Sequence, residues 1–248
     1  MRYLIIFFFL TKSLIYSQTF DKTKSLKDYS VKTIITSQVR SEGNKAILRG
    51  SESKKNKEFV LSNYNGIQMS VYPAWDFGFW PKQKPNSIND FKYNIDGLSE
   101  LVNWGIENKM YMIHHCLFFP NKYFPNWFWE SSYNKKELDQ ILNNYIEKVL
   151  VTNKNGKKID ALNVINEIFD KNGNYRPSGN GNEDVKWMDI GYEDDNSGLN
   201  RDLKINDKHP VFVRKVLEKT RNLSDAKLEI RDYNIAFGGK KADGLYQL

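Results

Sequence analysis

The sequence predicts an α/β protein built on a parallel sheet with helical crossovers. Two observations support this prediction: apolar, β-rich runs recur along the 248-residue chain, and segments with helical spacing separate several of them. The runs are nearly continuous in apolar residues, which is typical of parallel strands buried on both faces. We therefore expect strands over Val31–Val39, Gly66–Tyr72, Met110–Phe119, Ala161–Phe169 and Lys227–Ile235.

Three segments between these runs have helical features. Apolar residues recur at helical spacing from Leu98 to Ile106, between the second and third runs, and from Leu138 to Val149, between the third and fourth. The longer helix begins with a capping-box pattern, Asn134 followed three residues later by Glu137. Before the fifth run, Pro210 suits a first helical turn.

The N-terminus and the composition restrict the class of protein. Residues 1–17 combine Arg2, an apolar run from Tyr3 to Leu10 and the small residue Ser17 near a plausible cleavage site, the pattern of a signal peptide. We therefore expect a secreted or periplasmic protein with a domain over residues 18–248 and no membrane association after cleavage. The formal charge of +7 forms no basic stripe and accompanies no recognised motif, so we expect no nucleic-acid partner.

Polar residues follow three of the predicted strands. Asn166 and Glu167 end the fourth run, Asp232–Asn234 end the fifth, and His114 and His115 lie in the third. Functional groups of parallel α/β proteins gather at the carboxyl ends of strands, so these clusters predict a site there. Loops that begin at strand ends would produce the same polarity without a site.

The sequence favours neither a metal nor a cofactor. His114 and His115 are neighbours on a strand and point to opposite faces, so they do not bind one ion together. Cys116 is the single cysteine, which excludes an intramolecular disulfide and a cysteine-based metal site. The long loop expected over Ser178–Lys208 contains "DDNSG" at Asp194–Gly198, whose spacing is incomplete for a calcium loop.

Four segments resemble motifs of one enzyme family, in the family's order. The segment "KKIDALNVINEIFDKNGNYRPS", Lys157–Ser178, resembles the acid/base strand of glycoside hydrolase family ten, the endo-1,4-β-xylanase family. Asn108–Phe128, Ala226–Ile235 and Phe91–Leu98 resemble its third strand, its fifth strand and the segment before a helix. The resemblance implies a (β/α)8 TIM barrel that hydrolyses a β-1,4-linked polysaccharide such as xylan by the retaining two-carboxylate mechanism.

The resemblance also implies roles for individual residues. Glu167 takes the position of the general acid/base, and the adjacent Asn166 can face the same site only if the backbone bends between them. Several of the family's sugar-binding residues are replaced here, by Ser70, Val71 and Ala74 at the second strand and by Asn163 on the fourth. The sequence therefore does not identify the polysaccharide. The expected substrate-binding residues are Asn166, His115, Trp127, Trp75 and Tyr233.

Structural explanations compete with these roles. Burying a glutamate costs several kcal/mol of folding free energy unless its charge is paired, the carboxyl is protonated or the group is catalytic. Arg176 is a candidate partner that would neutralise Glu167. Tyr123, Phe124 and Trp127 either stack on sugar rings or pack beneath the loop after the third strand.

The number of predicted elements indicates an incomplete barrel. Five strands end at Ile235 and 13 residues follow, whereas each further β-α unit with its next strand needs about 30 residues. We expect a barrel truncated after the fifth strand, with no nucleophile in this chain, because the family's Ile-Thr-Glu-Leu-Asp stretch is not in the sequence. The chain alone should then be inactive. Two alternatives remain: a non-catalytic carbohydrate-binding relative, and a basic secreted scaffold without a site.

Overall fold

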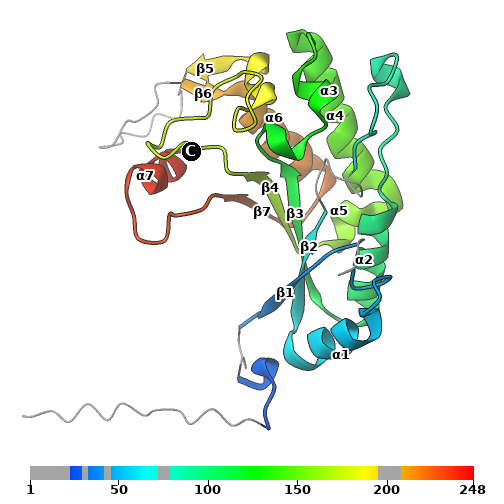
Figure 1. Ribbon diagram of the computed structural model, residues 1–248. Coiled ribbons are helices and arrows are strands. Elements are labelled where there is room, and N and C mark those ends of the chain that lie inside the picture. Colours follow the sequence, from blue (N-terminus) through cyan, green and yellow to red (C-terminus); the bar gives the residue numbers. More distant parts are fainter. Residues whose placement is uncertain (1–22, 30–32, 42–45, 72–78, 195–207) are drawn as a thin grey trace, which may run out of the picture.

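The computed structural model describes residues 23–29, 33–41, 46–71, 79–194 and 208–248. Within these ranges, five parallel strands form one sheet in the order β1-β2-β3-β4-β7 (Figure 1). The expected signal peptide, Trp75 and most of the "DDNSG" segment lie outside the described residues. The strands are β1 (Thr36–Val39), β2 (Gly66–Ser70), β3 (Tyr111–Phe118), β4 (Ala161–Asn166) and β7 (Lys227–Arg231).

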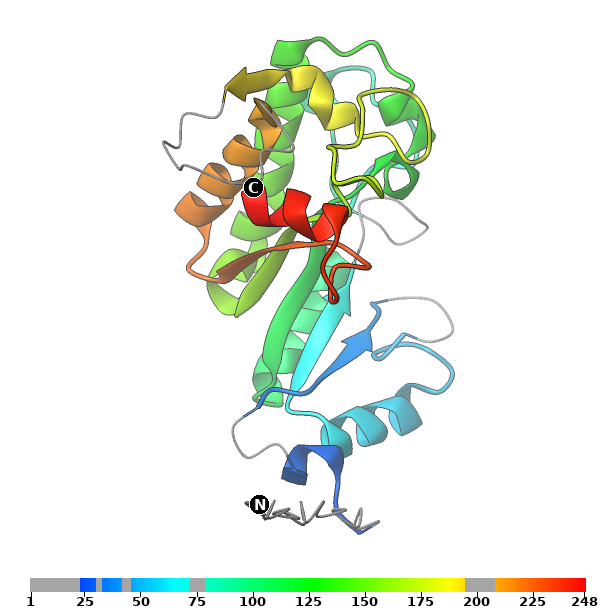
Figure 2. The ribbon, with the colours of Figure 1, turned by 90° about the vertical axis from the view of Figure 1, so that its left-hand side faces the viewer.

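Helices follow each strand of the sheet, as expected for β-α units. Figure 1 shows α2, α4 and α6 on one face of the sheet, and Figures 1 and 2 together show α7 near the opposite face, beside the upper ends of β4 and β7. The helices are α1 (Ser53–Asn63), α2 (Asp96–Glu107), α3 (Asn126–Trp129), α4 (Lys135–Val151), α5 (Asn155–Lys158), α6 (Val211–Leu223) and α7 (Lys240–Gln247). Short 3₁₀ turns cover Leu26–Tyr29, Ile88–Asp90, Asn121–Tyr123, Thr152–Lys154 and Lys186–Ile190.

The predicted start of α4 is confirmed. The side chain of Asn134 accepts hydrogen bonds from the backbone N–H groups of Lys136 and Glu137, and the Glu137 carboxylate accepts from the Asn134 N–H. This capping box satisfies backbone donors that have no partner within the helix. Pro210 lies one residue earlier than expected, because it caps α6 and ends a short strand instead of entering the first turn.

All five expected strands are shorter in the structure, the third by one residue at each end. The first is confined to Thr36–Val39, and the second ends at Ser70 instead of Tyr72. The fourth ends at Asn166 because Glu167 has a left-handed backbone conformation, with φ of 56°, that cannot continue a strand. The fifth ends at Arg231, and Asn234 beyond it has φ of 57°. Apolar composition therefore predicted where strands lie, but not where the backbone turns.

The expectation of a plain loop over Ser178–Lys208 is wrong. The stretch contains the 3₁₀ turn Lys186–Ile190 and the strand β5 (Tyr192–Asp194), which pairs antiparallel with β6 (Lys208–Pro210). Strands of three residues are too short to produce a periodic pattern, so composition alone could not reveal them.

A cluster of aromatic rings is part of the hydrophobic core. Ring centroids of Trp80 and Phe128 lie 4.7 Å apart, and those of Phe128 and Trp187 lie 4.8 Å apart. Phe124 and Tyr145 pack against the same rings and are buried. No helix in the described ranges is long and apolar enough to cross a bilayer.

Candidate active site

Glu167 lies at the carboxyl end of β4, where the strand stops. Its left-handed backbone costs roughly 1–2 kcal/mol for a residue with a side chain. Two hydrogen bonds hold it: the Glu167 N–H donates to the Arg231 carbonyl (2.9 Å), and the Glu167 carbonyl accepts from Arg176 Nε (2.8 Å). The bend that the sequence required between Asn166 and Glu167 is present, and the two side chains contact each other.

A tight turn after Glu167 returns the chain to the same place. Asp170 Oδ1 accepts from the backbone N–H groups of Asn172 (2.8 Å) and Asn174 (3.0 Å), and Gly173 supplies the positive φ that the turn needs. The turn brings Arg176 back to the strand end, where its backbone N–H donates to the Ile168 carbonyl (2.9 Å).

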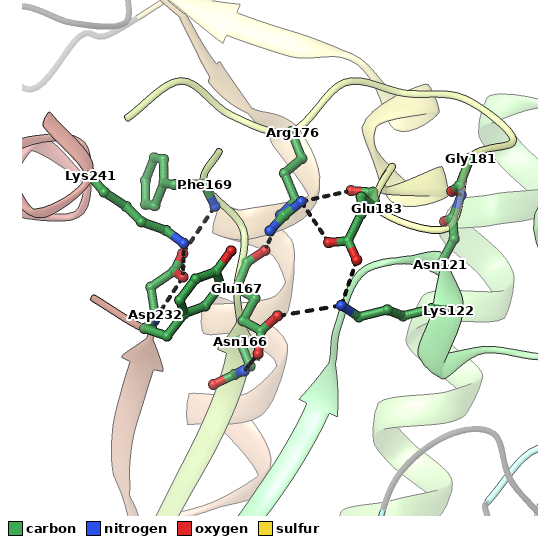
Figure 3. Close-up of polar contacts among 11 residues, drawn as sticks. Asn121, Lys122, Asn166, Glu167, Phe169, Arg176, Gly181, Glu183, Asp232 and Lys241 are labelled. Atoms are coloured by element: carbon green, nitrogen blue, oxygen red, sulfur yellow. Dashed lines mark hydrogen bonds and ion pairs between the residues drawn. The ribbon is translucent and has the colours of Figure 1, made fainter. Parts of the chain in front are cut away.

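Arg176 does not neutralise Glu167 in the way that the sequence suggested. Its guanidinium bonds the backbone carbonyl of Glu167 and pairs with Glu183 (2.8 Å), as Figure 3 shows. The cation paired with the Glu167 carboxylate is Lys122, whose Nζ lies 3.9 Å from Glu167 Oε2. Lys122 also pairs with Glu183 at 2.6 Å, so it lies between two carboxylates.

The surroundings of Glu167 favour its protonated form. The Glu167 side chain is 19% exposed, and burial raises the pKa of Glu167 above its ordinary value. Lys122 opposes this pKa shift, Asp232 adds to it, and the weaker effects of Arg176 and Glu183 act in opposite directions. A carboxyl with a raised pKa keeps its proton to higher pH than an ordinary glutamate and can release it during a reaction.

Asn166 and His115 are joined to Glu167 through amide groups. Asn166 Nδ2 donates to Glu167 Oε1 (3.3 Å), and the Asn166 amide lies 3.0 Å from that of Asn163. On its other side the Asn163 amide lies 2.7 Å from His115 Nδ1, within hydrogen-bonding distance. Burial lowers the pKa of His115 to about 4, and the charge of Arg231 adds to this, so the imidazole is neutral at neutral pH.

A second ion pair is buried at the end of β7. The Asp232 side chain is fully buried, accepts a hydrogen bond from the Phe169 N–H (3.1 Å) and pairs with Lys241 of α7 (2.7 Å), as Figure 3 shows. Tyr233 is 49% exposed, and Lys241 Nζ lies 3.3 Å from the centre of its ring. Tyr233 therefore lies beside the site, with part of its ring open to solvent.

The remaining aromatic candidates differ in their placement. Phe124 is buried in the aromatic core. Tyr123 stacks on Phe119 at 3.9 Å between ring centroids. Trp127 is half-buried, packs against Phe91 and donates its indole N–H to the Pro81 carbonyl (3.0 Å). The described contacts of Trp127 are with neighbouring aromatic rings and the Pro81 backbone, and they include none with Glu167.

Sequence reasoning missed three charged residues of this site: Lys122, Glu183 and Lys241. Lys122 and Glu183 pair across 61 residues of sequence, whereas Lys241 lies in α7 and pairs with Asp232 at the end of β7. Lys122 lies in the 3₁₀ turn that follows β3, so the clustering of polar residues after strands was the one signal that pointed to it. Within the described ranges, no three His, Cys, Asp or Glu side chains gather to hold a metal ion.

Comparison with known proteins identifies the family. The profile of glycosyl hydrolase family 10 matches residues 80–248, which is more than half of the chain. This chain belongs to glycosyl hydrolase family 10. The family match begins after β2, but β1 and β2 belong to the same parallel sheet as the strands within it.

Individual relatives of this family 10 chain are distant. Endo-1,4-beta-xylanase A of Thermoanaerobacterium saccharolyticum is 28% identical over 178 residues, 66% of this chain and 13% of that protein. Exoglucanase XynX of Acetivibrio thermocellus is 27% identical over 178 residues, 66% of this chain and 14% of that protein. The structure of xylanase 10B from Thermotoga petrophila, solved with xylobiose, superposes with a TM-score of 0.67 and 22% identity, covering 90% of this chain and 57% of that one.

The chain thus spans a small part of these two relatives and somewhat more than half of the solved xylanase. The structural match shows the fold: the five-stranded parallel sheet with its helices corresponds to part of a (β/α)8 barrel. The predicted fold class is confirmed in that respect.

Proposed function

We propose that this chain carries the acid/base half of a retaining hydrolase for β-1,4-linked polysaccharides, with Glu167 as the general acid/base. The observation that supports this role is the position of Glu167: a largely buried carboxyl with a raised pKa at the carboxyl end of a barrel strand. In the first step Glu167 would protonate the glycosidic oxygen of the leaving sugar. In the second it would take a proton from the attacking water.

The neighbouring groups have roles in this proposal. Asn166, fixed by its hydrogen bond to Glu167, would bind a hydroxyl of the sugar whose bond is cleaved, and His115 would orient the Asn163–Asn166 pair as a neutral imidazole. Tyr233 presents an exposed ring at the same edge for contact with sugar. We also propose Trp75 and Trp127 as sugar contacts from the sequence resemblance alone.

The retaining mechanism needs a second carboxylate about 5–5.5 Å from the first. Asp232 and Glu183 are the acidic groups whose charges act on Glu167, and both are held in ion pairs, Asp232 with Lys241 and Glu183 with Lys122 and Arg176. We assign neither of them as the nucleophile. The names of the relatives point to xylan and to glucan, so we propose a β-1,4-linked xylan or glucan as the substrate.

Export of the protein is a further proposal. It rests on the signal-peptide pattern of residues 1–17 and places the protein outside the cytoplasm, where polysaccharide is met. Detection of the protein in the culture medium or periplasm, with a new N-terminus near Ser17, would support it.

The decisive variant is Glu167→Gln in the protein expressed from its whole reading frame. The amide keeps the size of the side chain and loses the titratable proton, so turnover of xylan and β-1,4-glucan oligosaccharides should fall about a hundredfold or more. Aryl glycosides with an activated leaving group need no proton in the first step, so their first step should be affected far less. The matched control is Glu107→Gln, an exposed glutamate at the end of α2.

Two results would contradict the proposed role. Unchanged turnover of Glu167→Gln would remove Glu167 from the chemistry, and loss of the folded circular dichroism spectrum would make Glu167 a structural residue. If the unaltered protein binds xylohexaose without cleaving it and Glu167→Gln binds it equally well, the protein is a carbohydrate-binding relative instead.

A further inference from the structure

Lys122 is the unusual element of the site, because it places a cation beside a carboxyl that must be protonated to act as an acid. Its Nζ lies 3.9 Å from Glu167 Oε2 and 2.6 Å from Glu183 Oε1. The Lys122 side chain is 33% exposed, so screening by solvent is incomplete at this pair. Figure 3 shows the Lys122 side chain directed between the two carboxylates.

The backbone around Lys122 fixes this arrangement. Asn121 is buried, and its side chain donates to the carbonyls of Gly179 (2.9 Å) and Gly181 (3.0 Å) and accepts from the Lys186 N–H (2.8 Å). The Lys122 N–H donates to the Asn182 carbonyl (2.9 Å). These bonds join the turn after β3 to the loop that carries Glu183, so Lys122 and Glu183 meet as parts of one hydrogen-bonded unit.

Glu183 in turn forms ion pairs with two cations. It pairs with Lys122 and also with Arg176 Nη1 at 2.8 Å, while Arg176 holds the Glu167 carbonyl. The more strongly Glu183 attracts Lys122, the less of the lysine charge acts on Glu167. The arrangement therefore sets how far a cation opposes protonation of the proposed acid.

We propose that Lys122 is a positioning residue that sets the charge state of Glu167, and that Glu183 limits the effect of Lys122 by pairing with its ammonium group. This inference rests on the proposed function of Glu167 for its catalytic meaning. The charges that face Glu167 come from every neighbouring element: Lys122 after β3, Arg176 and Glu183 in the loop after β4, and Asp232 after β7 with its partner Lys241 on α7. From β3, Cys116 interacts electrostatically with Glu167, and the neutral His115 contacts the Asn163 amide.

Three variants separate this role from simple packing. Lys122→Met keeps most of the stem and removes the charge, so the pKa of Glu167 should rise by about one unit. Lys122→Arg keeps a cation there and should leave the pKa near that of the unaltered protein. Glu183→Gln releases Lys122 and Arg176 and removes an anion near Glu167, so the pKa of Glu167 should fall. Lys148→Met, an exposed lysine of α4, is the control.

The measurement is a carboxyl ¹³C NMR titration of the full-length protein labelled in its glutamate side chains, with Glu167→Gln used to assign the Glu167 signal. Turnover is not needed for this readout, so it holds even if Glu167 proves not to be catalytic. If Glu167 is catalytic, the alkaline limb of kcat/KM should move to higher pH in Lys122→Met and to lower pH in Glu183→Gln, because the acid must be protonated to act.

The inference is overturned if Lys122→Met leaves the Glu167 titration unchanged, or if Lys122→Arg shifts it as much as Lys122→Met. If Lys122→Met fails to fold, Glu183→Gln decides the matter, because an unchanged or raised pKa of Glu167 in that variant contradicts the inference. A shifted titration combined with full activity of Glu167→Gln would reject the proposed function while leaving the electrostatic role of Lys122 in place.

Discussion

At the scale of single residues, the sheet holds two adjacent histidines in different surroundings. His115 faces the amide pair beside Glu167, whereas His114 points to the helix-covered side and is fully buried. His114 Nε2 lies 3.3 Å from the Val71 carbonyl, its Nδ1 has no hydrogen-bond partner among the described residues, and the ring of Phe79 lies 5.5 Å away. Burial lowers the pKa of His114 to about 3.

We predict that His114 makes the protein less stable as the pH falls. The unfolded chain binds a proton on this imidazole near pH 6.5 and the folded chain only near pH 3, so the unfolded state holds more protons between these values. At pH 5 this should cost about 2 kcal/mol relative to pH 7. Urea unfolding of the full-length protein at both pH values, compared with His114→Gln, measures it. An equal loss of stability in the variant would contradict the prediction.

At the scale of elements, the buried pair of Asp232 and Lys241 attaches α7 to the ends of β4 and β7. Asp232 bonds the Phe169 backbone after β4, and Lys241 reaches it from the first turn of α7. Charge pairs of this kind contribute little net stability compared with apolar packing, but the loss of one partner leaves an unpaired buried charge.

We therefore expect Lys241→Met to destabilise the full-length protein by about 3 kcal/mol. The double variant Asp232→Asn with Lys241→Met should regain part of this loss, because no charge then remains buried. Lys240→Met, at the exposed neighbouring position, is the control and should change the unfolding midpoint little. Equal effects of Lys240→Met and Lys241→Met in thermal unfolding would show that the ion pair does not anchor α7.

At the scale of the whole molecule, the described sheet is covered by helices on one face and carries polar side chains on the other. Arg231 Nη1 donates to Gln68 Oε1 (2.6 Å) across the sheet, and Gln38 Nε2 donates to Ser70 Oγ (2.7 Å). In the described sheet, β1 and β7 each pair with one neighbour only. Phe237 and Tyr246, near and within α7, are highly exposed.

We predict that the 248-residue polypeptide, produced by itself, does not form a stable monomer. Two open strand edges and exposed aromatic rings favour association between chains. Size-exclusion chromatography with light scattering, followed by thermal unfolding, tests this. A purified monomer that melts in one sharp, cooperative transition would show the prediction to be wrong.

The sequence by itself predicted where the five strands of the sheet lie, the helices α2, α4 and α6, and the position of Glu167 at a strand end. Local patterns produced these results: apolar runs placed all five strands of the sheet, the spacing of Asn134 and Glu137 predicted the α4 cap, and a carboxylate directly after an apolar strand marked the proposed acid. The bend after Asn166 was also predictable, because adjacent side chains on a regular strand cannot face one site.

Only the tertiary structure decided which groups surround Glu167. The sequence suggested Arg176 as its partner, but the folded chain brings Lys122 to the carboxylate and gives Arg176 to the backbone and Glu183. Lys122 and Glu183 are 61 residues apart in the chain. Such pairs depend on how loops from different strands meet at one edge of the sheet, and neither the period of an element nor a local motif carries that information.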